Sequence, residues 1–242
     1  MIKRLKYLCI FLVLVLVGVV CYEKTKVRVL DYEKFWDKTS YEFSTIESFY
    51  NSSYSKGLKD FFYLEPTSLD DLIKHSEYVL KVRVNGKEVL GEGILNHAVI
   101  LNVIKGDLKE NDKIQFYDLV VLCRPLISAT YIAGTTPLEQ KQEYYIFLKK
   151  PKFPNKKDTY IYSSLEYGYF KVDSATRILY DYNPYNESFF SLNHAEKYDF
   201  ISLVQDENYY FDMEKEEGVQ LEKKDYTNYL NIKNEIIEKY EN

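Results

Sequence analysis

Tyr144-Tyr145-Ile146-Phe147-Leu148 is a run of five aromatic or aliphatic residues between the polar residues Glu143 and Lys149. A strand with one face in water alternates apolar and polar side chains, whereas a strand covered on both faces is apolar throughout. This run therefore predicts a central strand. The segments before and after it are expected to build the rest of the sheet.

Three strands are predicted before this run. In the first, apolar residues alternate with basic ones, namely Tyr78, Leu80, Val82 and Val84 with Lys81 and Arg83. Asn85-Gly86, a pair typical of tight turns, is expected to end it. The second strand spans residues 95–104 and ends at Lys105-Gly106-Asp107. The third spans residues 114–123 and bends at Asp118.

A helix is predicted to begin after Pro66. Ser68 can cap it, and Asp70 and Asp71 then lie in its first turn, where negative charge is favourable. Paired carboxylates can instead carry out acid–base chemistry or bind a cation, but capping explains this pair better.

After residue 151, a second β region is predicted at residues 160–162, 169–172 and 178–180. Beyond Pro184 the apolar spacing becomes helical, first around Ile201 and then in the final segment. Asp225 is expected to cap that last helix.

Residues 68–148 carry a resemblance to known proteins. Its elements are Ser68-Leu69-Asp70-Asp71-Leu72-Ile73, Ser76-Glu77-Tyr78-Val79, Val103-Ile104-Lys105-Gly106-Asp107-Leu108, and Leu138-Glu139-Gln140 before the central run. The pattern resembles exported proteins of Gram-positive bacteria, and its order is similar to that of netrin-like modules and tissue inhibitors of metalloproteases, which are OB-type barrels. Those inhibitors use a disulfide-bonded N-terminal cysteine, which the body of this chain lacks, so their activity is not expected here.

The expected fold class is therefore α+β. An antiparallel OB-like barrel or sandwich spans residues 66–151, and residues 152–242 add a β hairpin and C-terminal helices packed on it. Residues 1–22 are expected to form one hydrophobic helix, a signal anchor or signal peptide. Residues 23–65 are expected to be a juxtamembrane stalk.

The membrane prediction rests on residues 7–22, which carry no charge and follow the basic residues Lys3, Arg4 and Lys6. Such an order is typical of an export signal or a signal anchor. An uncleaved anchor is the first interpretation. A lipid-linked Cys21 is the second, although Val20 stands where a lipobox has a small residue. Either way, the body is expected outside the cytoplasm at the cell membrane.

The charge balance and the cysteine count each exclude one feature, a nucleic-acid partner and an internal disulfide. Without Lys3, Arg4 and Lys6, 29 of the 32 basic residues remain against 37 acidic ones, a formal charge of −8. That balance gives no support to a phosphate-binding surface, so nucleic acid is not an expected partner. Cys123 is the one cysteine beyond residue 22, which excludes a disulfide within the body.

The sequence shows no catalytic or cofactor motif. His75, His97 and His194 do not pair at metal-ligand spacing. His97 lies on the apolar face of its strand and is expected to be a core histidine with its hydrogen bonds satisfied. No cofactor, metal or catalytic residue is predicted.

One segment is a candidate contact surface, the long apolar connection at residues 124–134. Its candidate contact residues are Arg124, Leu126, Ile127, Tyr131 and Ile132. An exposed apolar loop marks a binding surface, while a loop packed over one end of the barrel is the alternative. The leading hypothesis is a non-catalytic, membrane-tethered module that binds a protein or envelope ligand. An envelope hydrolase with a dispersed site and a structural envelope protein are the alternatives.

The anchor hypothesis predicts that the full-length protein sediments with membranes. The uncharged segment at residues 7–22 is stable in lipid rather than in water. Fractionation of cells followed by immunodetection tests this. Full-length protein dissolved in the cytosol would contradict it.

Overall fold

The structure is a computed structural model. It describes residues 30–31, 40–44, 62–63, 66–90, 93–118, 120–123, 128–132, 136–151, 158–173, 175–182, 197–203, 211–212, 217–218 and 226–241. The helices are α4 (Leu69–Lys74) and α5 (Thr227–Tyr240). The strands are β1 (Leu30–Asp31), β2 (Ser40–Ser44), β3 (Tyr78–Leu90), β4 (Gly93–Lys105), β5 (Lys113–Tyr117), β6 (Val120–Cys123), β7 (Ser128–Ile132), β8 (Glu143–Lys149), β9 (Thr159–Tyr162), β10 (Tyr169–Lys171), β11 (Ile178–Tyr182), β12 (Phe200–Leu203), β13 (Phe211–Asp212) and β14 (Glu217–Gly218).

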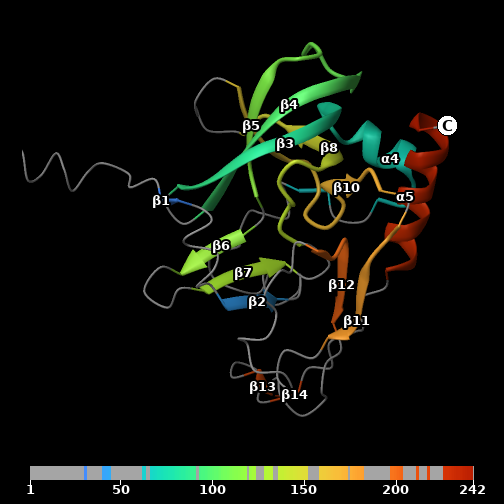
Figure 1. The fold of residues 1–242 in the computed structure, drawn as a ribbon. Coiled ribbons are helices and arrows are strands. Elements are labelled where there is room, and N and C mark those ends of the chain that lie inside the picture. The colour runs from blue at the N-terminus through green and yellow to red at the C-terminus, as the bar shows by residue number, and fades with distance from the viewer. Residues whose placement is uncertain are drawn as a thin grey trace, which may run out of the picture.

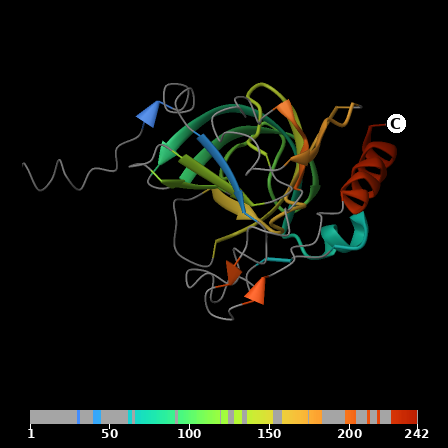
Figure 2. The ribbon, with the colours of Figure 1, turned by 90° about the horizontal axis from the view of Figure 1, so that it is seen from below.

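Five of these strands close into a ring in the order β3-β4-β5-β9-β8, with β8 pairing back to β3. All the pairs in the ring are antiparallel except β5 and β9, which run parallel. Seen from below, the ring is a barrel with α4 and α5 outside it (Figure 2). The β-rich α+β prediction is thereby confirmed.

Strand β8 is central, as predicted from its apolar run. One edge pairs with β3, while the other pairs with β10 through its first half and with β9 through its last two residues. Residues 144–148 are all buried. Tyr144, Ile146 and Leu148 point into the barrel core, and Tyr145 and Phe147 point into a second core.

The second core lies between the barrel and the helices, which stand together on one side of the molecule (Figure 1). It is rich in aromatic rings: Phe147 packs edge-on against Phe170, and Phe170 stacks on Tyr229 of α5. Ile232 and Ile236 lie on the same face of α5 and are also buried. The helix predicted for the final segment is thus confirmed, and its buried face covers β8.

A buried ion pair fixes the position of α5. Nζ of Lys233 lies 3.4 Å from Oδ2 of Asp199, and each side chain is 2 % exposed. The same carboxylate oxygen accepts the Arg177 backbone N–H at 2.8 Å. Burial lowers the pKa of Lys233, and the nearby Asp199 carboxylate partly offsets this by favouring the charged ammonium. Because breaking such a pair leaves a buried charge without its partner, the contact specifies how α5 docks.

The start of α4 forms as predicted, because Ser68 caps the helix by accepting the Asp71 backbone N–H. At α5 the N-cap is Tyr226, which makes no side-chain capping bond. The predicted cap, Asp225, lies outside the described residues.

The prediction of a turn at Asn85-Gly86 is wrong. Strand β3 continues to Leu90 and pairs with β4 along its whole length, so that the hairpin turns between Leu90 and Gly93. The register shifts between Val84 and Gly86, which leaves Asn85 as the extra residue of a β-bulge. Asparagine and glycine suit a bulge as well as a turn, and sequence alone does not separate the two.

The single strand predicted at residues 114–123 is two strands in different sheets. β5 belongs to the barrel, whereas β6 pairs with β7 in a three-stranded sheet that also contains β2. Part of the predicted contact loop is therefore strand β7. Residues 23–65, expected to be a stalk, contribute β1 to the barrel sheet and β2 to the second sheet.

Two predictions for residues 152–242 are also corrected. β9, β10 and β11 form no hairpin with one another, because β9 and β10 both pair with β8 and β11 pairs with β12. The first predicted helix, around Ile201, is instead β12, which runs parallel to β11. Over so few residues, the spacing of apolar residues does not distinguish a helix from a short buried strand.

Two glycines give a matched test of the barrel geometry. Gly106 has φ +114°, and a Cβ there would lie 2.5 Å from the Tyr78 ring, whereas a Cβ at Gly86 would meet nothing within 4 Å. Gly106→Ala is expected to lower the free energy of unfolding by about 2 kcal/mol. Gly86→Ala is expected to change it by less than about 0.5 kcal/mol. Urea unfolding measures both, and equal losses would contradict the described backbone.

Candidate functional site

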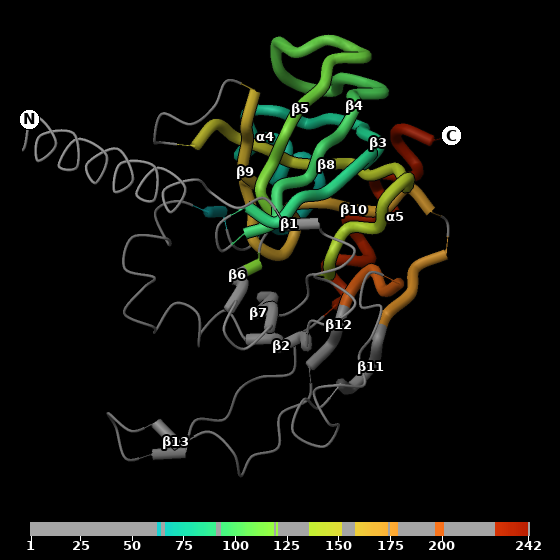
Figure 3. Tube along the Cα trace, turned by 60° about the vertical axis from the view of Figure 1, so that its left-hand side comes forward, coloured from blue at the N-terminus to red at the C-terminus, as the bar shows by residue number. Residues whose placement is uncertain are grey.

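A hollow of about 550 Å³ opens on the outer face of the barrel. It lies over β3, β4 and β5 and beside the start of β9, strands that run side by side in Figure 3. Its size is within the range of small-molecule sites. It is lined by Asn85, Gly86, His97, Ala98, Val99, Lys113, Ile114, Gln115 and Asp158.

The register of the strands explains why these residues meet. Gly86 of β3 pairs with His97 of β4, and His97 pairs in turn with Gln115 of β5. The Gln115 backbone N–H donates to the carbonyl of Asp158, just before β9. One row across β3, β4, β5 and the turn before β9 thus brings together residues from positions 86, 97, 115 and 158.

The bulge in β3 creates the open space. Gly86 has no side chain, and nothing lies within 4 Å of where its Cβ would be. A residue with a side chain at this position would fill the hollow beside His97. The glycine therefore has a spatial role here rather than a conformational one.

His97 forms the centre of the row. Its Nδ1 lies 3.1 Å from the Gln115 amide nitrogen, and its Nε2 lies 3.4 Å from a carboxylate oxygen of Glu88. A ring protonated on Nε2 alone fits both contacts, because Nδ1 then accepts from the amide and Nε2–H faces the carboxylate. The side chain is 37 % exposed. The prediction of a core histidine is therefore wrong, although Nδ1 does have a hydrogen-bond partner.

His97 was predicted to lie in the core because the wrong face of its strand was taken as the inner one. Residues of β4 that point into the barrel include Ala98 and Ile100, whereas His97 and Val99 lie on the opposite, outer face. Valine and leucine occur on both faces of β4, so alternation did not identify the inner one.

Two opposite charges lie at the hollow. Lys113 and Asp158 are both exposed, and Asp158 holds a left-handed backbone conformation with φ +66°. That conformation is uncommon for residues other than glycine but is tolerated by aspartate. It turns the chain into β9 beside Gln115.

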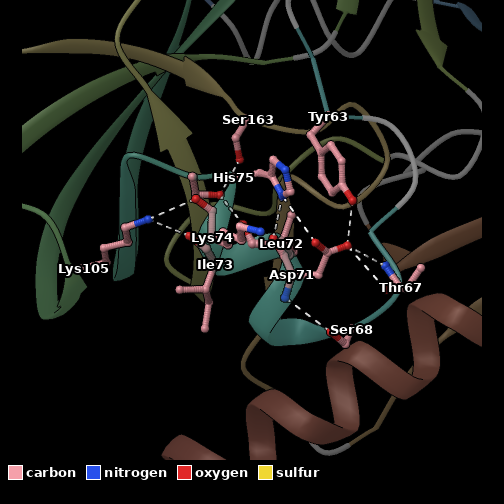
Figure 4. Close-up of polar contacts among 11 residues, drawn as sticks. Tyr63, Thr67, Ser68, Asp71, Leu72, Ile73, Lys74, His75, Lys105 and Ser163 are labelled. Atoms are coloured by element: carbon pink, nitrogen blue, oxygen red, sulfur yellow. Dashed lines mark hydrogen bonds and ion pairs between the residues drawn. The ribbon is translucent and has the colours of Figure 1, made fainter.

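A second polar cluster surrounds Asp71 on α4 (Figure 4). The Tyr63 hydroxyl donates to Oδ2 of Asp71 at 2.6 Å, and the Thr67 backbone N–H donates to the same atom at 3.1 Å. The His75 ring stacks on Tyr63 with centroids 3.7 Å apart, and its Nδ1 lies 3.4 Å from Oδ1 of Asp71.

The contacts of this cluster join two parts of the chain. Nδ1 of His75 also lies 2.9 Å from the backbone carbonyl oxygen of Asp71. The neighbouring Ser76 hydroxyl is buried and donates to the Leu72 carbonyl, so it is not available as a nucleophile. The contacts tie the segment at Tyr63 to the end of α4, in agreement with the capping interpretation.

The structure gives no side-chain placement for Cys21 or for the candidate contact residues. Arg124, Leu126, Ile127 and Cys21 lie outside the described residues. Tyr131 and Ile132 belong to β7, where the backbone is described but the side chains are not. The sequence did not predict the hollow, because its residues come from β3, β4, β5 and the turn before β9. The residues after Asn85-Gly86 are Lys87-Glu88-Val89-Leu90, which do not alternate between polar and apolar, so no local pattern marked the continuing strand.

The described ranges contain neither a metal-ligand cluster nor a helix that could span a membrane. No group of three or more His, Cys, Asp or Glu residues there could hold a metal ion. No helix among them is long and apolar enough to cross a bilayer. Residues 7–22 lie outside those ranges.

No protein-family model matches the chain, and no curated protein matches it. The hollow is therefore interpreted from its geometry.

The Asp71 cluster predicts a pH effect. The hydrogen bond from Tyr63, followed by that from Thr67, lowers the pKa of the Asp71 carboxyl. A lowered folded-state pKa stabilises the protein above the ordinary value of about 3.9 and loses this effect as the pH falls through the folded value. An NMR titration of the Asp71 carboxyl carbon should therefore show a midpoint below about 3.9. A midpoint at or above that value in the folded protein would contradict the cluster.

Proposed function

We propose that this chain is a membrane-tethered, extracytoplasmic binding module and that the hollow on β4 and β5 receives its ligand. The single observation that carries the proposal is the open space over Gly86, bordered by polar side chains from β3, β4, β5 and the turn before β9. The tether is residues 7–22, and the basic residues before them favour a body outside the cytoplasm.

The body is proposed to be an OB-type barrel. Support comes from the ring order β3-β4-β5-β9-β8 and from the parallel pairing of β5 with β9. In OB folds, ligands bind across the second and third strands and the loop before the fifth. Here those are β4, β5 and the segment that ends at Asp158, which is where the hollow lies.

An envelope hydrolase is the second candidate, because the hollow joins a histidine to the carboxylate of Asp158. Binding is favoured over hydrolysis for two reasons. Nδ1 of His97 already accepts a hydrogen bond from the Gln115 amide, so it is not free to act as a base. Among the described residues that line the hollow, none carries a hydroxyl or thiol that could attack a substrate.

Photocrosslinking tests the binding proposal in the organism's own cells. A benzophenone amino acid replaces Lys113 at the hollow, and in a parallel strain it replaces the exposed Lys109 outside the hollow. We expect a discrete crosslinked adduct from position 113 and none of that kind from position 109. The full-length, membrane-bound protein is used throughout.

Two added leucines provide the matched control. Gly86→Leu places a side chain at the hollow, where a Cβ would meet nothing within 4 Å, whereas Asn102→Leu adds the same side chain to an exposed position of β4 away from it. The adduct at position 113 should fall at least tenfold with Gly86→Leu, since about 1.4 kcal/mol of lost binding is a factor of ten. It should persist with Asn102→Leu. An adduct that Gly86→Leu leaves unchanged would contradict the assignment of the hollow.

A further inference from the structure

We infer that Lys233 and Asp199 condense to an amide, which joins α5 covalently to the residue before β12. Four features of the molecule support this: the distance between the two side chains, their burial, the hydrogen bonds that hold Asp199, and a body that contains no disulfide.

The two reacting groups lie close together. Nζ of Lys233 is 3.4 Å from Oδ2 of Asp199, and the carboxyl carbon Cγ is one bond away from that oxygen. Groups that a protein holds about 3–3.5 Å apart react as if their concentration were about 10⁵ M or more. The fold itself therefore supplies the proximity that the same reaction lacks in solution.

Burial shifts the balance between free ions and amide. In water, hydration of the ammonium and the carboxylate favours the ions, but both side chains here are 2 % exposed and have lost most of that hydration. Tyr229, one turn before Lys233 on α5, packs against the rings of two phenylalanines, Phe170 and Phe200. Burial also lowers the pKa of Lys233, which favours the neutral, nucleophilic amine.

A second pair shows why distance alone is not enough. Nζ of Lys171 lies 2.6 Å from Oε2 of Glu139, closer than in the first pair, but the Glu139 side chain is 34 % exposed. That carboxylate keeps much of its hydration, so the free ions remain favoured. The Lys233–Asp199 pair combines proximity with burial at both ends.

Hydrogen bonds to Arg177 hold Asp199 in a reactive orientation. The Arg177 backbone N–H donates to Oδ2 at 2.8 Å, and the Asp199 backbone N–H donates to the Arg177 carbonyl at 2.7 Å. A fixed backbone donor stabilises the negative charge that develops on a carbonyl oxygen when a nucleophile attacks. Oδ2 is therefore the oxygen that stays in the amide, and Oδ1 is the one that leaves.

Atoms and charges balance without a further reactant. A proton passes from the Lys233 ammonium to Oδ1 of Asp199, which gives a neutral amine and a neutral acid. The Nζ–Cγ bond then forms and the Cγ–Oδ1 bond breaks. The nitrogen gives a second proton to Oδ1, which departs as water. A neutral amide replaces a buried ion pair, so the cost of holding two charges away from water is removed.

The amide gives the body a covalent link that its cysteine content does not allow. Cys123 is the one cysteine beyond residue 22, so no disulfide can form within the body. The amide closes residues 199–233 into a ring. Because α5 begins at Thr227 and β12 at Phe200, the helix stays joined to the rest of the body even when the contacts around it open.

Peptide mapping by mass spectrometry tests the inference on the full-length protein, purified in detergent and then denatured. Trypsin does not cleave after an acylated lysine, so the amide predicts a branched peptide in which residues 198–215 are joined to residues 225–239. Its mass should equal the sum of the two peptides less one water, about 18 Da. Lys233→Arg keeps a positive charge beside Asp199 but presents a guanidinium in place of an amine, and the branched peptide should be lost.

The Lys171–Glu139 pair is the internal control in the same digest. Trypsin should cleave after Lys171 and release residues 158–171 at their unmodified mass. Recovery of residues 198–215 as a free peptide, together with cleavage after Lys233, would overturn the inference. A link at Lys171 as well would contradict the role given to burial.

Discussion

Strand β8 makes contacts on all sides. Its two edges pair with β3, β9 and β10, and its two faces pack into the barrel core and into the core beneath α5. Phe147 shows this most clearly, since its N–H donates to the Gly168 carbonyl at 2.9 Å and its own carbonyl accepts the Ser163 N–H at 2.9 Å. Its ring packs into the aromatic core beneath α5. Tyr145, on the same face, donates its hydroxyl to Glu241 just beyond α5. One strand therefore couples barrel closure to helix docking.

The candidate site depends on this closure at a distance. β8 pairs with β9 and so holds it next to β5. Asp158 therefore lies beside Gln115, although 42 residues lie between the two in the sequence. The other half of the hollow comes from the β3–β4 hairpin and its bulge at Asn85. A long strand with one extra residue thus leaves an opening over Gly86 without weakening the core behind it, where Val84 and Ala98 remain buried.

Sequence patterns predicted the parts of this structure that local residues determine. The apolar run of β8, the alternation up to Val84, the Ser68 cap and the stripe on α5 all follow from nearest-neighbour spacing. The bulge at Asn85 and the inner face of β4 could not be predicted in this way, because each depends on the register between strands. The hollow could not be predicted for the same reason, since His97, Gln115 and Asp158 are brought together only when the ring closes. Short segments such as the one at Ile201 were ambiguous between helix and strand.

Hydrogen exchange of the native protein, read residue by residue by NMR, tests the coupling through β8 most directly. If β8 joins the barrel to α5, the amides of Phe147, Ser163 and Ile236 should exchange only through global unfolding and give the same opening free energy. Exchange of Ile236 through an opening about 2 kcal/mol easier than that of Phe147 would show that α5 detaches on its own. That result would contradict the account.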